Sequence, residues 1–210
     1  MNMTTNWRRI GLICAAAASL SLGRIWLAEA SAADEIARLA SLMQWKAGTV
    51  VADIGAGDGQ YSFAAAARVG PTGRVYASEI DEKKLEELRA EVKRRNLSNV
   101  IVVTSKEADT GLSAACCDAI FLRRVYHHLT KPAEFDAQIV ASLKSGGRLA
   151  IIDFAPRPGL DPVGGIPSNR GGHGIAERIV VEELTAAGLH VEREVQDWPD
   201  DSYCVVFVKK

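Results

Sequence analysis

Short apolar runs alternate with amphipathic segments from about residue 34 to residue 153 of the chain. The apolar runs are too short for buried helices, which predicts strands at residues 50–54, 74–78, 100–104, 119–122 and 148–153. The segments between them carry apolar side chains at helical spacing, which predicts helices at residues 34–45, 60–69, 82–95 and 133–143, the first with Asp34 as N-cap. Strands that alternate with helices in this way are typical of an α/β domain with a parallel sheet.

The pattern changes after residue 153. Residues 154–175 contain four prolines and six glycines without any apolar period, which predicts a long loop of the kind that is usually functional or mobile. A helix is predicted at residues 176–187, and two alternating strands are predicted at residues 190–196 and 202–208. The turn between these strands makes them a terminal antiparallel hairpin.

The first 32 residues differ in character from the rest. Arg8 and Arg9 precede an uncharged run at residues 10–23, and small residues with A-x-A spacing follow at residues 28–33. This layout predicts that residues 1–32 form a signal peptide for export to the periplasm or the outside, or else an N-terminal membrane anchor. We expect the folded domain to span residues 33–210 and to contact a membrane only through the N-terminal segment.

Composition narrows the class of partner. Hydrophobic residues make up 48% of the chain and charged residues 24%, and the net charge is −1, so no global positive field indicates nucleic acid. The four cysteines include Cys14 in the predicted leader and the adjacent pair Cys116 and Cys117. This arrangement predicts neither a disulfide framework nor a metal site. Nothing in the sequence indicates an oligomeric state.

A glycine-rich turn after the strand at residues 50–54 carries most of the functional information. The turn has the spacing G-x-G-x-G, and the next strand is followed by Glu79. This order of elements forms a cradle for a cofactor that contains adenosine. Asp53 and Asp58 would repel the pyrophosphate of a dinucleotide, and Gln60 stands where the dinucleotide pattern requires a third glycine. The cradle therefore favours S-adenosylmethionine (SAM), which carries positive charges and no phosphate.

These residues resemble motif I and the second-strand acid of the class I SAM-dependent methyltransferases. Residues 117–122 resemble the fourth strand of that family, and residues 143–149 resemble its L-K-P-G-G turn, with Ser145 in place of the proline. The resemblance runs from about residue 33 to the C-terminus. It implies a Rossmann-like, doubly wound sheet that is mostly parallel, with an antiparallel last strand and the order 3-2-1-4-5-7-6.

The resemblance also implies roles for individual residues. Asp53 would orient the ammonium group of SAM, Glu79 would bind the ribose hydroxyls, and Glu107 would receive the adenine amino group, with Asp109 as an alternative. The full set of expected cofactor-binding residues is Asp53, Gly55, Ala56, Gly57, Gly59, Glu79, Ile80 and Glu107.

The acceptor side is less defined. Arg123 would face a substrate carboxylate or form a structural ion pair, and His127, His128 and His173 are candidate bases. The expected function is methyl transfer from SAM to a small-molecule acceptor. Two alternatives remain open at this point. One is a SAM-binding protein without turnover, and the other is an oxidoreductase that uses NAD(P) as its cofactor.

Overall fold

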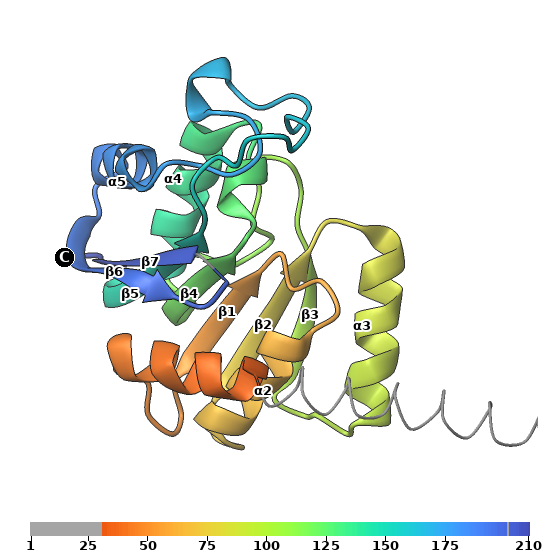
Figure 1. The fold of residues 1–210 in the computed structure, drawn as a ribbon. Coiled ribbons are helices and arrows are strands. Elements are labelled where there is room, and N and C mark those ends of the chain that lie inside the picture. Colours follow the sequence, from red (N-terminus) through yellow and green to blue (C-terminus); the bar gives the residue numbers. More distant parts are fainter. Residues whose placement is uncertain (1–30, 201) are drawn as a thin grey trace, which may run out of the picture.

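A seven-stranded sheet forms the middle layer of the domain (Figure 1). The computed structural model describes residues 31–200 and 202–210. The order of the strands is β3-β2-β1-β4-β5-β7-β6, and β7 is antiparallel to both of its neighbours while the other pairs are parallel. This confirms the predicted fold class. The strands are β1 (Val50–Ile54), β2 (Arg74–Glu79), β3 (Val100–Thr104), β4 (Cys117–Arg123), β5 (Leu143–Asp153), β6 (His190–Trp198) and β7 (Ser202–Val208).

Helices cover both faces of the sheet. A leading helix (residues 31–42), α2 (Gln60–Val69) and α3 (Glu82–Arg94) contribute to the core on one face. The helices α4 (Pro132–Ser142) and α5 (Glu177–Ala186) contribute to the core on the other face. Two short 3-10 turns, η1 (Tyr126–His128) and η2 (Ser168–Arg170), lie in the connections.

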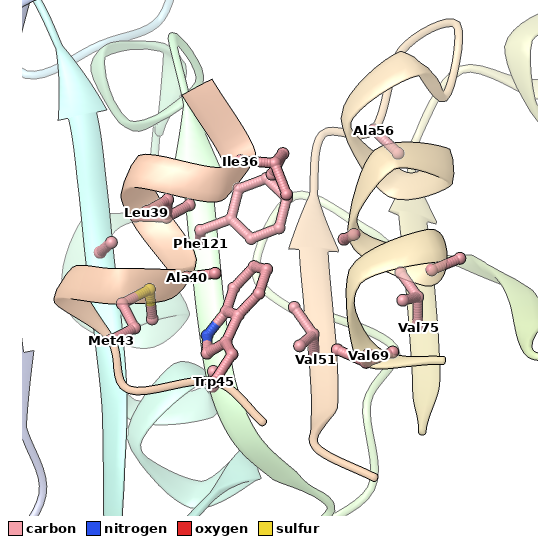
Figure 2. Packing of buried hydrophobic residues seen from close by; sticks show 14 of the residues in the cluster. Ile36, Leu39, Ala40, Met43, Trp45, Val51, Ala56, Val69, Val75 and Phe121 are labelled. Carbon is pink, nitrogen blue, oxygen red and sulfur yellow. The ribbon is translucent and has the colours of Figure 1, made fainter. Parts of the chain in front are cut away.

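The two cores follow from the alternation of side chains along each strand. Phe121 points into the first core, whereas its neighbours Ile120 and Leu122 point into the second. Figure 2 shows the first core, where the Trp45 ring lies 6.0 Å from the Phe121 ring, measured between centroids. Because both faces are covered, the central strands are apolar on both sides, as the sequence predicted for the strand at residues 50–54.

Some local predictions were wrong. The leading helix already runs through residues 31–33, so Asp34 is not its N-cap. The strand β5 begins at Leu143 rather than at residue 148, because Leu143 pairs with Cys117 ahead of a register shift. Cys116 and Cys117 form a disulfide between adjacent residues at the start of β4, whereas the sequence predicted no disulfide framework.

The predicted signal peptide or anchor lies almost entirely outside the described residues, which begin at residue 31. Within the described part of the chain, no helix combines the length and the apolar character needed to cross a bilayer.

The long loop between β5 and α5 is fastened by a buried polar network. Arg170 is 1% exposed and donates hydrogen bonds to the carbonyl oxygens of Leu129 and Tyr126, at 2.7 and 3.2 Å, and to Glu183 at 3.0 Å. The Tyr126 hydroxyl lies 2.9 Å from Glu183 and 2.9 Å from Asp136. Through these contacts the network holds the loop against η1 and the second core.

One carboxyl group of this network is protonated. A hydroxyl has one proton and can donate to only one of two carboxylates, so the second carboxyl must donate to it. Burial, together with the charge of Glu183, raises the pKa of Asp136 to about 7, despite the hydrogen bond from Tyr126. Asp136 therefore carries the shared proton at and below neutral pH.

We predict that Asp136→Asn removes a pH-dependent loss of stability. Because the pKa of Asp136 is higher in the folded than in the unfolded chain, its stabilising contribution is present below about pH 4 and is lost as the pH rises through 7. The free energy of unfolding of the variant, relative to that of the wild type, should rise by about 1 kcal/mol per pH unit from pH 4 to 7. Above pH 7 the difference should stay constant. Urea denaturation at several pH values measures this difference. Glu134→Gln, at an exposed site on the same helix, is the control, and a pH-independent difference for Asp136→Asn would contradict the assignment.

Candidate active site

The glycine turn after β1 has the backbone that the sequence predicted. Gly55, Gly57 and Gly59 all have positive φ angles, which other residues rarely adopt. A side chain at Gly55 would collide with Val125, so this glycine lets the segment after β4 approach the turn. A Cβ at Gly57 would stand in open space, with no heavy atom within 4 Å. The turn therefore offers bare backbone to a ligand at Gly57.

Glu79 links this turn to the end of β2. One carboxylate oxygen accepts the N–H of Gly57 at 2.9 Å, and the other accepts the N–H groups of Ile80 and Asp81 at 2.7 and 3.0 Å. A carboxylate has about four acceptor sites, so one remains on the oxygen that faces Gly57. A ribose hydroxyl can use that site directly, whereas a second hydroxyl would have to displace one of the three N–H groups.

Asp53 is a buried acid at the end of β1. Its side chain is 3% exposed and accepts a hydrogen bond of 2.6 Å from the Ser62 hydroxyl. Burial raises the pKa of Asp53 to about 7, and the charges of Glu79 and Asp58 act in the same direction, against the Ser62 hydrogen bond. A cation in front of Asp53 would favour its ionised form, so this site suits a positively charged ligand group.

The turn and Asp53 border a cleft of about 370 Å³. This volume lies within the range of small-molecule and cofactor sites. One wall is the glycine turn, and the opposite wall is built from elements distant in sequence. The lining residues are Ser31, Asp53, Gly55, Ala56, Asp58, Gln60, Tyr61, Arg123 and Asp200.

Asp58 occupies the N-terminal end of α2. Its carboxylate accepts the backbone N–H of Gln60 at 3.2 Å and the Gln60 side-chain amide at 3.0 Å. An anionic side chain therefore already stands where the helix would otherwise attract a phosphate.

Glu35 of the leading helix organises the wall that faces Asp53. It is 5% exposed and accepts hydrogen bonds from Arg123 at 2.9 and 3.2 Å, from Trp198 at 2.6 Å and from Tyr61 at 2.8 Å. Burial alone would raise the pKa of Glu35, but these donors hold it below its usual value. The sequence predicted either a substrate contact or a structural ion pair for Arg123. The structure shows the ion pair, and Arg123 also lines the cleft.

His127 forms a buried pair with Asp153 at the ends of β4 and β5. Its Nδ1 lies 2.8 Å from one Asp153 oxygen, and its Nε2 is buried without a hydrogen-bond partner among the described residues. The rings of His128 and His173 lie 4.0 and 5.4 Å from the His127 ring, measured between centroids. The structure therefore brings the three candidate bases together, with His173 supplied by the long loop.

Glu107 does not join the cleft lining. It is exposed, and its carboxylate accepts hydrogen bonds from the Thr130 hydroxyl at 2.6 Å and from Lys131 at 2.8 Å. The alternative, Asp109, is also exposed and accepts the N–H of Gly111 at 2.8 Å. The predicted residues Gly57, Gly59, Glu79 and Ile80 do not line the cleft either. Ile80 is 58% exposed next to Glu79 in the chain, so a flat apolar group could cover it. Within residues 31–200 and 202–210, no cluster of side chains is suited to a metal ion.

Sequence reasoning missed Glu35, Tyr61 and Asp200. Glu35 sits between Asp34 and Ile36 in an amphipathic helix, and only its position on the apolar face of that helix could have marked it. Asp200 belongs to the turn between β6 and β7, whose contact with the end of β4 is a property of the tertiary fold.

Comparison with known proteins shows that the chain is similar to methyltransferases. A family model described as a methyltransferase domain matches residues 52–151. Nocamycin O-methyltransferase from Saccharothrix syringae is 29% identical over 123 residues, which are 59% of this chain and 44% of that protein. The chain thus matches less than half the length of this curated relative.

Solved structures agree on the fold. A SAM-dependent methyltransferase from Aquifex aeolicus has a TM-score of 0.71 and 26% identity, covering 83% of this chain and 89% of that one. The [4+2]-cyclase SpnF has a TM-score of 0.68 and 15% identity, covering 84% of this chain and 81% of that one. At such low identity, the likeness to SpnF shows the fold alone.

We predict that Glu35→Gln destabilises the protein by about 3 kcal/mol, because it leaves the half-buried Arg123 guanidinium without its main counter-charge. The amide also replaces one acceptor oxygen by nitrogen, which cannot accept the hydrogen bonds that Arg123 Nη2 and the Tyr61 hydroxyl donate to the same carboxylate oxygen. Urea denaturation measures the loss, and Asp34→Asn, at the exposed neighbouring position, is the control. Equal stability of the Glu35 and Asp34 variants would contradict the role of Glu35.

Proposed function

We propose that the chain is a class I SAM-dependent methyltransferase and that it transfers a methyl group from SAM to a small-molecule acceptor. The observation that carries this proposal is the presence of two buried acids at the glycine turn, Asp53 at the end of β1 and Glu79, which accepts the N–H of the bare Gly57 backbone. The matching family model and the Aquifex aeolicus structure support it.

Asp53 in the cleft, together with Glu79 and Ile80 at the end of β2, fits SAM. Asp53 would hold the ammonium group. Burial raises the pKa of this carboxyl group, and a nearby cation would stabilise its ionised form. Glu79 would accept a ribose hydroxyl, and the exposed Ile80 side chain would pack against adenine. The proposed contact of Glu107 with adenine has less support, because that carboxylate is already engaged by Thr130 and Lys131.

The same cleft argues against a nicotinamide dinucleotide. A pyrophosphate would bind at the N-terminus of α2, where Asp58 accepts the N–H of Gln60. It would also stand near Asp53, so that like charges would meet in a partly buried space. The cofactor class that avoids this repulsion is the cationic one.

His127 is the residue we propose as general base. SAM, when bound, supplies an electrophilic methyl group, and an acceptor hydroxyl attacks best after it loses its proton. Asp153 fixes His127 through Nδ1, so the lone pair of Nε2 is directed away from Asp153. Because Nε2 is buried in the ligand-free chain, an acceptor has to displace neighbouring side chains to reach it. Asp153 acts as a positioning residue. The O-methyltransferase named among the relatives supports an oxygen acceptor.

We predict that Glu79→Gln weakens the binding of S-adenosylhomocysteine by about tenfold or more, because a charge-assisted hydrogen bond to ribose is lost. Isothermal titration calorimetry measures the affinity. Glu82→Gln, at an exposed position at the start of α3, is the control and should bind like the wild type. Unchanged affinity of the Glu79 variant, with a native circular dichroism spectrum, would remove Glu79 from the site.

We predict that His127→Gln lowers methyl transfer by at least about 100-fold while the affinity for S-adenosylhomocysteine stays within twofold. The assay follows labelled methyl groups from SAM into small molecules of a deproteinised cell extract. His190→Gln, at an exposed position at the start of β6, is the control. Full activity of the His127 variant would exclude the base, and no transfer by the wild type would favour a binding protein without turnover.

A further inference from the structure

Three arginines converge on one residue at the edge of the cleft. We call Arg123, Arg124 and Arg157 the arginine cluster. The Asp200 carboxylate lies 3.6 Å from the Arg123 guanidinium and 3.2 Å from that of Arg124. The Asp200 carbonyl oxygen accepts further hydrogen bonds from Arg124 at 3.3 Å and from Arg157 at 2.9 Å.

The cluster has more positive charge than its partners neutralise. Apart from Asp200, Glu35 is the one carboxylate within ion-pair distance of any of the three, counted over the residues that the structure describes, and it pairs with Arg123. The Nε of Arg124 is buried and has no partner among the described residues. Arg124 and Arg157 also lie over the Phe154 ring, with guanidinium carbons 5.8 and 4.6 Å from its centroid. A second anion would therefore find an unused donor and an uncompensated charge.

The interaction of the Asp200 side chain with the arginine cluster is weak. Its side chain is 64% exposed, and exposed ion pairs are weak because water and salt compete for them. Asp200 and Arg124 both have left-handed backbones, with φ of 59° and 56°, although neither is glycine. Strained backbone of this kind clusters at ligand-binding sites.

One member of the arginine cluster, Arg123, shares a cleft with the glycine turn. Arg123 and Asp200 line it together with Asp53 and Gly55. A ligand with a carboxylate at one end and a cationic or reactive group at the other could reach both the cluster and Asp53.

We propose that the arginine cluster is a carboxylate-binding site, which Asp200 fills in the ligand-free protein and from which a ligand carboxylate displaces it. The carboxylate belongs either to the methionyl part of the cofactor or to the acceptor. This choice of sources rests on the proposed function, whereas the binding of a carboxylate to the cluster does not.

The test removes the internal competitor. Asp200→Asn abolishes the charge that holds the cluster, and Asp197→Asn is the matched control, since Asp197 lies in the same hairpin but pairs with Arg38. A double variant, Asp200→Asn with Arg124→Gln, removes a donor as well. Calorimetry on the full-length chain compares S-adenosylhomocysteine with 5′-methylthioadenosine, which lacks the amino-acid part, and NMR titration measures the binding of benzoate.

Either of two results supports the proposal. If the site holds the methionyl carboxylate, Asp200→Asn binds S-adenosylhomocysteine about fivefold more tightly and methylthioadenosine unchanged. If it holds an acceptor carboxylate, the affinity for S-adenosylhomocysteine is unchanged, and benzoate binds the variant about fivefold more tightly in its presence. In both cases the double variant loses the gain.

The proposal is overturned if Asp200→Asn changes neither affinity, or if Asp197→Asn produces the same gain. Failure of the proposed function looks different, because the wild type would then bind neither adenosine compound. In that event benzoate binding to the free protein still decides whether the arginine cluster takes a carboxylate.

Discussion

The parallel register of the central strands is the constraint on which the site depends. Ile54 of β1 pairs with Ser78 of β2 and with Leu122 of β4, so the carboxyl ends of these strands lie at one edge of the sheet. Asp53, Glu79 and Arg123 are therefore neighbours in space although they are up to 70 residues apart in the chain. The apolar cores on both faces fix this register, because a slip by one residue would turn each core side chain to the opposite face.

The charged side chains at this edge of the sheet determine which ligands it can bind. The glycine turn carries buried or capping acids, and the same cleft is lined by Arg123, which pairs with Glu35 and Asp200. A ligand with separated positive and negative groups complements such a cleft, whereas a polyanion does not. Beyond β4, the buried pair of His127 and Asp153 lies beside the Phe154 ring, over which Arg124 and Arg157 lie, and His173 of the long loop lies next to the same pair.

The sequence was informative where the signal was local. The strand at residues 50–54, the strand order, and the positions of Asp53 and Glu79 follow from apolar runs, glycine spacing and resemblance to a family. The sequence could not supply contacts that depend on distant segments coming together. Glu35 meets Trp198 across 163 residues, and no local pattern distinguishes a buried anion of this kind from a solvated one.

The charge of the cradle is the central claim, and one calorimetric experiment tests it most directly. The unmodified protein is titrated at neutral pH with S-adenosylhomocysteine and, separately, with NAD⁺. Both ligands contain adenosine. In NAD⁺ the adenosine carries a pyrophosphate, whereas in S-adenosylhomocysteine it carries an amino-acid group with an ammonium. The account predicts saturable binding of S-adenosylhomocysteine and no measurable binding of NAD⁺. Binding of NAD⁺ as tight as that of S-adenosylhomocysteine would contradict it.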